Sequence, residues 1–68
     1  MMTTHTVTVP ADVYTGLMAV LDAPGITLLD LPAVLTWLRR EGHTVSYEWA
    51  IRHAREFGRA MLYGFDSE

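Results

Sequence analysis

Few side chains in this sequence could perform acid–base, nucleophilic or metal chemistry, and their spacing does not bring them together. The three histidines are His5, His43 and His53, and only His53 has a carboxylate one helical turn away, that of Glu56. Cysteine is absent, so no thiolate could act as a nucleophile or hold zinc. A metal site needs three or four converging ligands, and no such spacing occurs. The sequence therefore predicts a protein that is not an enzyme, with no catalytic residues, no metal and no cofactor.

Threonine alternates with valine near the start of the chain, and this pattern could bind nucleic acid. Thr4, Thr6 and Thr8 would lie on one face of a strand, with Val7 and Val9 on the other. Threonine can hydrogen-bond the edges of bases and can place its methyl group against that of thymine. The same alternation is typical of an ordinary solvated strand, so both interpretations of the threonine face stay open.

The cationic side chains are all arginines between residues 39 and 59, namely Arg39, Arg40, Arg52, Arg55 and Arg59. On a helix, Arg52, Arg55 and Arg59 could contact phosphates. The alternative is a solvated helix face in which Glu48 and Glu56 form ion pairs with these arginines. The net charge of the chain is −3, which opposes nucleic-acid binding because phosphate contacts supply most of the non-specific affinity.

A fourth set of side chains could bind a protein partner. Trp49, His53, Ala60 and Tyr63 are expected to form an aromatic patch on an otherwise polar helix face. Tryptophan and tyrosine are enriched among the residues that contribute most to protein–protein affinity. In the alternative interpretation, Trp49 packs against the first helix, the strand or the tail.

The elements that would position these side chains are one strand and three helices, a mainly α fold with the order β-α-α-α. The expected ranges are 4–9 for the strand and 10–22, 30–41 and 46–62 for the helices. The acidic tail, residues 64–68, is expected to fray. All of these elements belong to one small domain over residues 1–68, because a chain this short supports a single core.

Capping residues mark the helix ends. Pro10 suits the first turn of the first helix, and Asp30 is the less strained of two possible starts for the second. Arg39 and Arg40 suit the negative end of the second helix dipole, and Ser46 is the expected N-cap of the third helix. The apolar face of the third helix is expected to comprise Ala50, Ile51, Ala54, Phe57, Gly58, Met61 and Leu62.

A lone strand needs a partner, and a chain of 68 residues needs support beyond its own core. Disulfides cannot supply that support without cysteine, whereas half of the residues are apolar and some must lie near the surface. We therefore expect a homodimer that forms through the N-terminal strand. The sequence has no apolar run of the ~18–20 residues that span a bilayer and no signal-peptide pattern, so we expect no membrane contact and a cytoplasmic location.

The order of strand, proline-started helix, turn and second helix resembles the ribbon-helix-helix (MetJ/Arc-like) family of DNA-binding regulators. The resemblance covers residues 4–42. It rests on the strand HTVTV, the first helix PADVYTGL, the turn PGIT and the stripe Leu31, Val34, Leu35 and Leu38. The helix over 46–62 is additional to that fold.

Membership in this family would imply a defined way of reading DNA. Strands from two protomers would pair antiparallel, with Val7 and Val9 in the dimer core. Thr4, Thr6 and Thr8 would enter the major groove of duplex DNA as part of a two-stranded ribbon. The Gly25-Ile26-Thr27 turn would present backbone N–H groups to a phosphate, through Gly25 and Thr27.

An alternative fold is a three-helix domain that is similar to a helix-turn-helix. The second helix, the turn at Gly42 and the third helix would then form the motif, and Arg52, Arg55 and Arg59 would meet DNA. The leading interpretation is a small DNA-binding transcription regulator of phage or mobile-element origin. The alternative function is a small protein–protein interaction module that binds and modulates another protein, such as one of a host.

Overall fold

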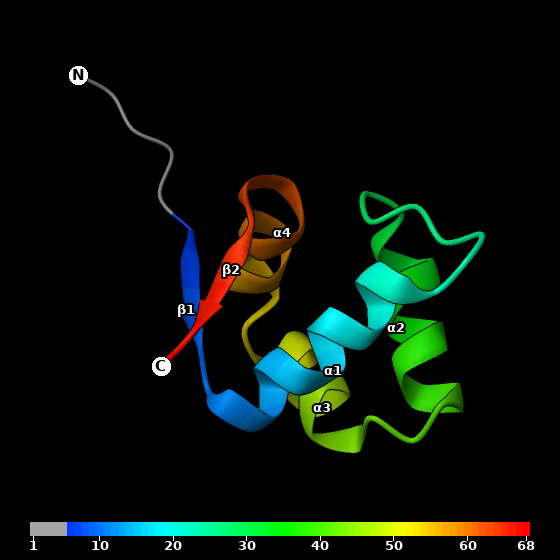
Figure 1. Cartoon of the computed structure of the whole chain (residues 1–68), viewed down its shortest axis with the longest axis horizontal. Helices are drawn as coiled ribbons and strands as arrows, with labels where there is room; N and C mark the ends of the chain where they lie inside the picture. Colours follow the sequence, from blue (N-terminus) through cyan, green and yellow to red (C-terminus); the bar gives the residue numbers. More distant parts are fainter. Residues whose placement is uncertain (1–5) are drawn as a thin grey trace.

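The computed structural model describes residues 6–68, which form four helices and two short strands (Figure 1). In chain order these are β1 (Val7–Val9), α1 (Ala11–Asp22), α2 (Leu31–Arg40), α3 (Thr44–Arg52), α4 (Ala54–Tyr63) and β2 (Phe65–Ser67). The fold is mainly helical with a short N-terminal strand, as the sequence predicts. It differs from the expected β-α-α-α order because it has a fourth helix and a second strand.

α1 and α2 lie where the apolar periodicity places them. Pro10 precedes α1, and Asp30 precedes α2. Asp30 is the expected cap, because its Oδ1 accepts a hydrogen bond from the backbone N–H of Ala33 at 3.3 Å. After α2, Gly42 has a φ of 82°, which a residue with a side chain rarely adopts, and it turns the chain toward α3.

The expected third helix is broken at His53, so the prediction of one continuous helix over 46–62 is wrong. His53 has a φ of −122° and a ψ of 54°, which interrupts the helical backbone between α3 and α4. α3 packs against α1 and α2, whereas α4 packs against β1. No proline or glycine between Ala50 and Phe57 marks the break, so tertiary packing overrides local propensity here. Several residues of the expected apolar face are consequently exposed, namely Ile51, Ala54 and Leu62.

β1 pairs with β2, and together they form a parallel two-stranded sheet. The register pairs Val7 with Phe65, Thr8 with Asp66 and Val9 with Ser67. The N–H of Val7 donates to the carbonyl of Gly64 at 3.0 Å, and the N–H of Glu68 donates to the carbonyl of Val9 at 2.9 Å. The expectation of a frayed tail is therefore wrong. Because the partner strand belongs to the same chain, the formation of β1 does not require a second protomer.

The hydrophobic core lies among the four helices and reaches the inner side of β1. Its buried members are Val9, Val13, Leu17, Val20, Val34, Leu38, Ala50, Phe57, Ala60 and Met61. Tyr14 and Phe65 extend it to β2, since their rings meet edge to face with centroids 5.6 Å apart. α1 therefore lies across the middle of the molecule, with the sheet at one side and α2 at the other (Figure 1).

α1 and α3 approach each other closely at Gly16 and Ser46. The Ser46 hydroxyl is buried and donates to the carbonyl of Val13 at 3.1 Å. A Cβ atom on Gly16 would lie 2.0 Å from the Oγ of Ser46, so only glycine fits this crossing. The prediction that Ser46 caps the third helix is wrong, because α3 begins at Thr44 and Ser46 lies inside it.

Candidate functional site

The threonine face of β1 carries a carboxylate from the neighbouring strand. Thr4 lies outside the described residues, whereas Thr6 and Thr8 are exposed. The Thr6 Oγ1 donates to the Oδ2 of Asp66 at 2.7 Å, and Asp66 is also the register partner of Thr8. A phosphate that approached this face would therefore meet a negative charge and a hydroxyl that is already hydrogen-bonded.

The loop that the resemblance assigns to phosphate binding is separate from the N-terminus of α2. Gly25 and Thr27 are exposed in the loop that precedes this helix. The first turn of α2 already has an anion, because the carboxylate of Asp30 accepts the N–H of Ala33. The positive end of the helix dipole is thus satisfied within the chain.

The three arginines expected to contact DNA are exposed but lie on two helices. Arg52 is in the last turn of α3, and Arg55 and Arg59 are one turn apart on α4. The sequence predicts that all three lie on one continuous helix. Because the helix is interrupted at His53, these side chains do not follow a single helix face. Glu56 lies in the first turn of α4 between them.

Trp49 and His53 lie together as expected, with ring centroids 5.4 Å apart and ring planes tilted by 33°. The other members of the expected aromatic patch do not share one surface with them. Ala60 is buried in the core with 1% of its surface exposed, and Tyr63 lies at the far end of α4. Trp49 itself is partly buried, packs against the core and lines a groove with Pro10 at the start of α1.

A surface that the sequence analysis does not single out lies along α2. Pro32, Thr36 and Arg40 are spaced by four residues, so they lie on one face of the helix, and all three are exposed. These residues form a ridge with a groove on each side, and they line both grooves. We refer to this ridge with its two grooves as the α2 surface.

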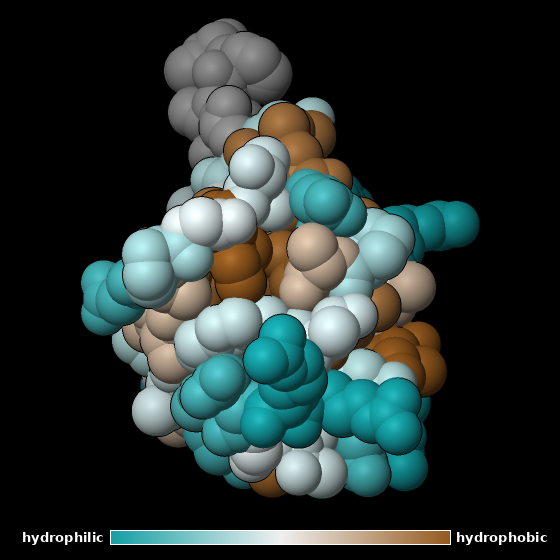
Figure 2. Space-filling model, turned by 90° about the vertical axis from the view of Figure 1, so that its right-hand side faces the viewer, coloured by the Kyte–Doolittle hydropathy of each residue, from teal (hydrophilic) through white to brown (hydrophobic). Residues whose placement is uncertain are grey.

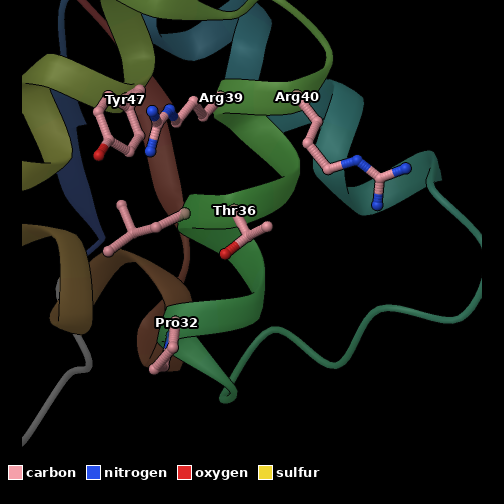
Figure 3. A pocket seen from close by; sticks show the side chains of 6 residues that line it. Pro32, Thr36, Arg39, Arg40 and Tyr47 are labelled. Atoms are coloured by element: carbon pink, nitrogen blue, oxygen red, sulfur yellow. The ribbon is translucent and has the colours of Figure 1, made fainter.

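The first groove lies between α2 and α3 and has a volume of about 510 Å³ (Figure 3). Beside the ridge, it is lined by Leu35, Arg39 and Tyr47. Leu35 and Tyr47 are half-buried and pack against the core, so the floor of the groove is largely apolar. The guanidinium of Arg39 points toward the ring of Tyr47, whereas Arg40 extends away from it (Figure 3).

The second groove lies between α2 and the loop that precedes it. Beside the ridge, its lining consists of Ile26, Asp30, Ala33 and Trp37. The indole of Trp37 stacks on the ring of His43 with centroids 5.4 Å apart and planes 16° apart, which holds it beside the groove. Figure 2 looks onto this side of the molecule and shows apolar atoms at the bottom of a hollow, with more polar residues around it.

Charge distinguishes the groove between α2 and α3 from the second groove and from the groove at Trp49. Its lining includes Arg39 and Arg40 and no acidic residue. The second groove contains Asp30 beside Arg40, and the groove at Trp49 contains Asp12 and Glu48 beside Arg52. Sequence reasoning assigned Arg39 and Arg40 to the helix dipole alone. The spacing of exposed residues along α2 was the signal that could have revealed the ridge.

Comparison with family models, with curated proteins and with solved structures finds no match to this chain. Within residues 6–68, no group of three or more histidine or acidic side chains could hold a metal ion. In the same part of the chain, no helix has the length and apolar character needed to cross a membrane. The geometry of the surfaces is therefore the basis for a functional proposal.

Proposed function

We propose that this protein is a small non-enzymatic module that binds and modulates another protein through the α2 surface. The observation that carries the proposal is the exposed ridge of Pro32, Thr36 and Arg40 between two grooves with apolar floors. Half-buried aromatic side chains beside arginine are typical of the residues that anchor protein partners. Tyr47 contributes to one groove and Trp37 to the other.

The residues of the ridge have little part in holding the fold together. Pro32, Thr36 and Arg40 are all exposed, while the core side of the same helix is formed by Val34 and Leu38. Surface substitutions of this kind usually change stability by no more than about 0.5 kcal/mol. The α2 surface can therefore be altered without unfolding the chain, which makes its role in binding testable.

Site-specific photocrosslinking in the cell of origin tests this proposal. A photoreactive amino acid at Thr36 should crosslink a defined protein, whereas the same group at Glu48, which is exposed on α3, should not. The crosslink at position 36 should weaken when the exposed ridge residues are replaced in a Pro32→Ser, Arg40→Glu variant, which leaves the core side chains in place. Equal crosslinking at the two positions, or none at position 36, would refute binding at the α2 surface.

A DNA-binding transcription regulator is the second candidate function. The observation that favours it is the tandem arrangement of α2 and α3, which are joined through Gly42 as in a helix-turn-helix. Arg52 on α3 and Arg55 and Arg59 on α4 would supply the contacts with phosphates. An anisotropy titration with random duplex DNA at two salt concentrations tests it, because phosphate-dominated affinity falls steeply with salt. Absence of binding at low salt would exclude it.

We also propose that the protein functions as a homodimer. Many large apolar side chains of the described residues are exposed, namely Met18, Leu21, Leu29, Val45, Ile51, Leu62 and Tyr63. A single chain of this size buries only about 60% of the surface that its unfolded form exposes. Association would cover part of the remaining apolar area and add to a small core.

A further inference from the structure

We propose that the groove between α2 and α3 binds an acidic segment of the partner protein, an inference that rests on the function proposed above. In this interaction Arg39 and Arg40 pair with carboxylates of the segment. Leu35 and Tyr47 receive an apolar side chain from it. The inference follows from three properties of the groove: the charge of its lining, the direction of its two arginines and the nature of its floor.

The charge of the lining selects an anion. Arg39 and Arg40 both line the groove, with the guanidinium of Arg39 directed toward Tyr47 and that of Arg40 extending away from it, and no acidic side chain is part of the lining. This cationic lining belongs to a chain whose net charge is −3, so it is a local departure from the overall balance. Glu41 follows directly on α2 but does not contribute to the lining. Like-charged surfaces repel, so a basic segment is excluded and an acidic one is attracted.

The directions of the two arginines select an extended segment rather than a single carboxylate. Arg39 and Arg40 are adjacent on a helix, so their side chains leave the axis about 100° apart. Arg39 points toward the ring of Tyr47, and Arg40 extends away from that ring (Figure 3). In this arrangement the two guanidinium groups face different directions, which suits two separate carboxylates better than one. Each carboxylate can then bind with the bidentate geometry that arginine favours.

The apolar floor of the groove favours a bound segment that has an apolar residue between or beside its carboxylates. Leu35 and Tyr47 are half-buried and already pack against the core, so their positions are fixed before binding. Pro32 limits the groove at the N-terminal end of α2. An aliphatic or aromatic side chain that entered here would displace water from a rigid apolar surface, which is favourable. The expected ligand is therefore an acidic peptide segment with at least one large apolar residue.

Selection from a random 12-residue peptide display library on the immobilised full-length protein tests this inference. The enriched peptides should contain at least two Asp or Glu residues near a Leu, Ile, Met or Phe. A synthetic peptide of the enriched sequence, measured by fluorescence anisotropy, should bind about tenfold or more weakly to the Arg39→Gln, Arg40→Gln variant. The Arg39→Glu, Arg40→Glu variant should prefer basic peptides over acidic ones. It should therefore bind a version of the enriched peptide in which Arg replaces each acidic residue.

The matched control is the Arg55→Gln, Arg59→Gln variant, which changes the net charge by the same amount as Arg39→Gln, Arg40→Gln but on α4, outside the groove. This variant should retain the affinity of the wild-type protein. Enrichment of peptides without acidic residues, or an equal loss in the control, would overturn the acidic-segment inference. If a partner still crosslinks at position 36 in that case, the proposed function stands while this inference fails. If neither peptides nor a crosslinked partner are found, both fail.

Discussion

Gly16 and Ser46 determine how closely α1 and α3 can approach. Ser46 is a polar residue within the core, and its hydroxyl is satisfied by the carbonyl of Val13 at 3.1 Å. No buried side-chain nitrogen or oxygen in residues 6–68 lacks a hydrogen-bond partner. The pair thus combines a close backbone contact with a satisfied polar group, and it fixes the relative position of two helices that share the core.

Replacement of Gly16 by Ala should destabilise the protein, because the new methyl group would overlap the Ser46 side chain. Overpacking of this kind typically costs about 1–3 kcal/mol of the free energy of unfolding. Urea denaturation followed by circular dichroism would measure it. In a Ser46→Gly background the same Gly16→Ala change should cost less, since the overlapping atoms are absent. If the changes in the free energy of unfolding were strictly additive in this double-mutant cycle, Gly16 and Ser46 would not determine the approach of α1 and α3 together.

At the scale of elements, β2 holds β1 in place and links both ends of the described chain. Backbone hydrogen bonds join Val7 to Gly64 and Val9 to Glu68, and the Phe65 ring meets Tyr14 on α1. The tail was expected to fray because its composition is acidic and it lies at a chain end. That reasoning could not foresee the pairing, which depends on α4 ending beside β1.

Removal of residues 65–68 should therefore lower stability by about 2–3 kcal/mol, since a half-buried aromatic ring and several backbone hydrogen bonds are lost. Urea denaturation of the truncated and full-length chains would give this difference. Asp66→Ala is the matched control. It removes only the exposed hydrogen bond from Thr6 and should cost less than about 1 kcal/mol. A truncated chain as stable as the full-length protein would show that β2 does not support β1.

At the scale of the whole molecule, the outer edge of β1 remains open to a second strand. Val7 and Val9 direct their backbone groups toward β2, so those of Thr8 point to the opposite side because successive residues of a strand alternate. Figure 1 shows β1 at the outer side of the molecule. β1 contains no charged residue, and an uncharged open edge is suited to pairing with another chain.

For the proposed homodimer, light scattering after gel filtration should give about twice the chain mass of 7.7 kDa. If the dimer forms through the outer edge of β1, Thr8→Pro should convert it to a monomer, because proline lacks the N–H that points away from β2. The internal sheet should persist, and Thr8→Ala should leave the mass unchanged. A monomeric wild-type protein would refute self-association. A dimeric Thr8→Pro variant would place the interface elsewhere.

Local physical chemistry in the sequence was sufficient to predict part of this fold. The apolar periodicity of α1 and α2, the cap at Asp30 and the turn at Gly42 all depend on interactions within a few residues. The inward side of β1 was also predictable, since Val9 is fully buried as its alternation implies. The adjacency of Trp49 and His53 follows from helical spacing in the same way.

Only the tertiary structure decided the break at His53, the pairing of β1 with β2 and the grooves beside α2. Each depends on how separate elements pack against one another: α4 must leave the axis of α3 to reach β1, and Tyr47 on α3 must pack beside α2 to form a groove. Such arrangements minimise the free energy of the whole core rather than that of any segment, so short-range patterns do not encode them. For this reason the sequence indicated which residues could bind, whereas the packing determined which of them share a surface.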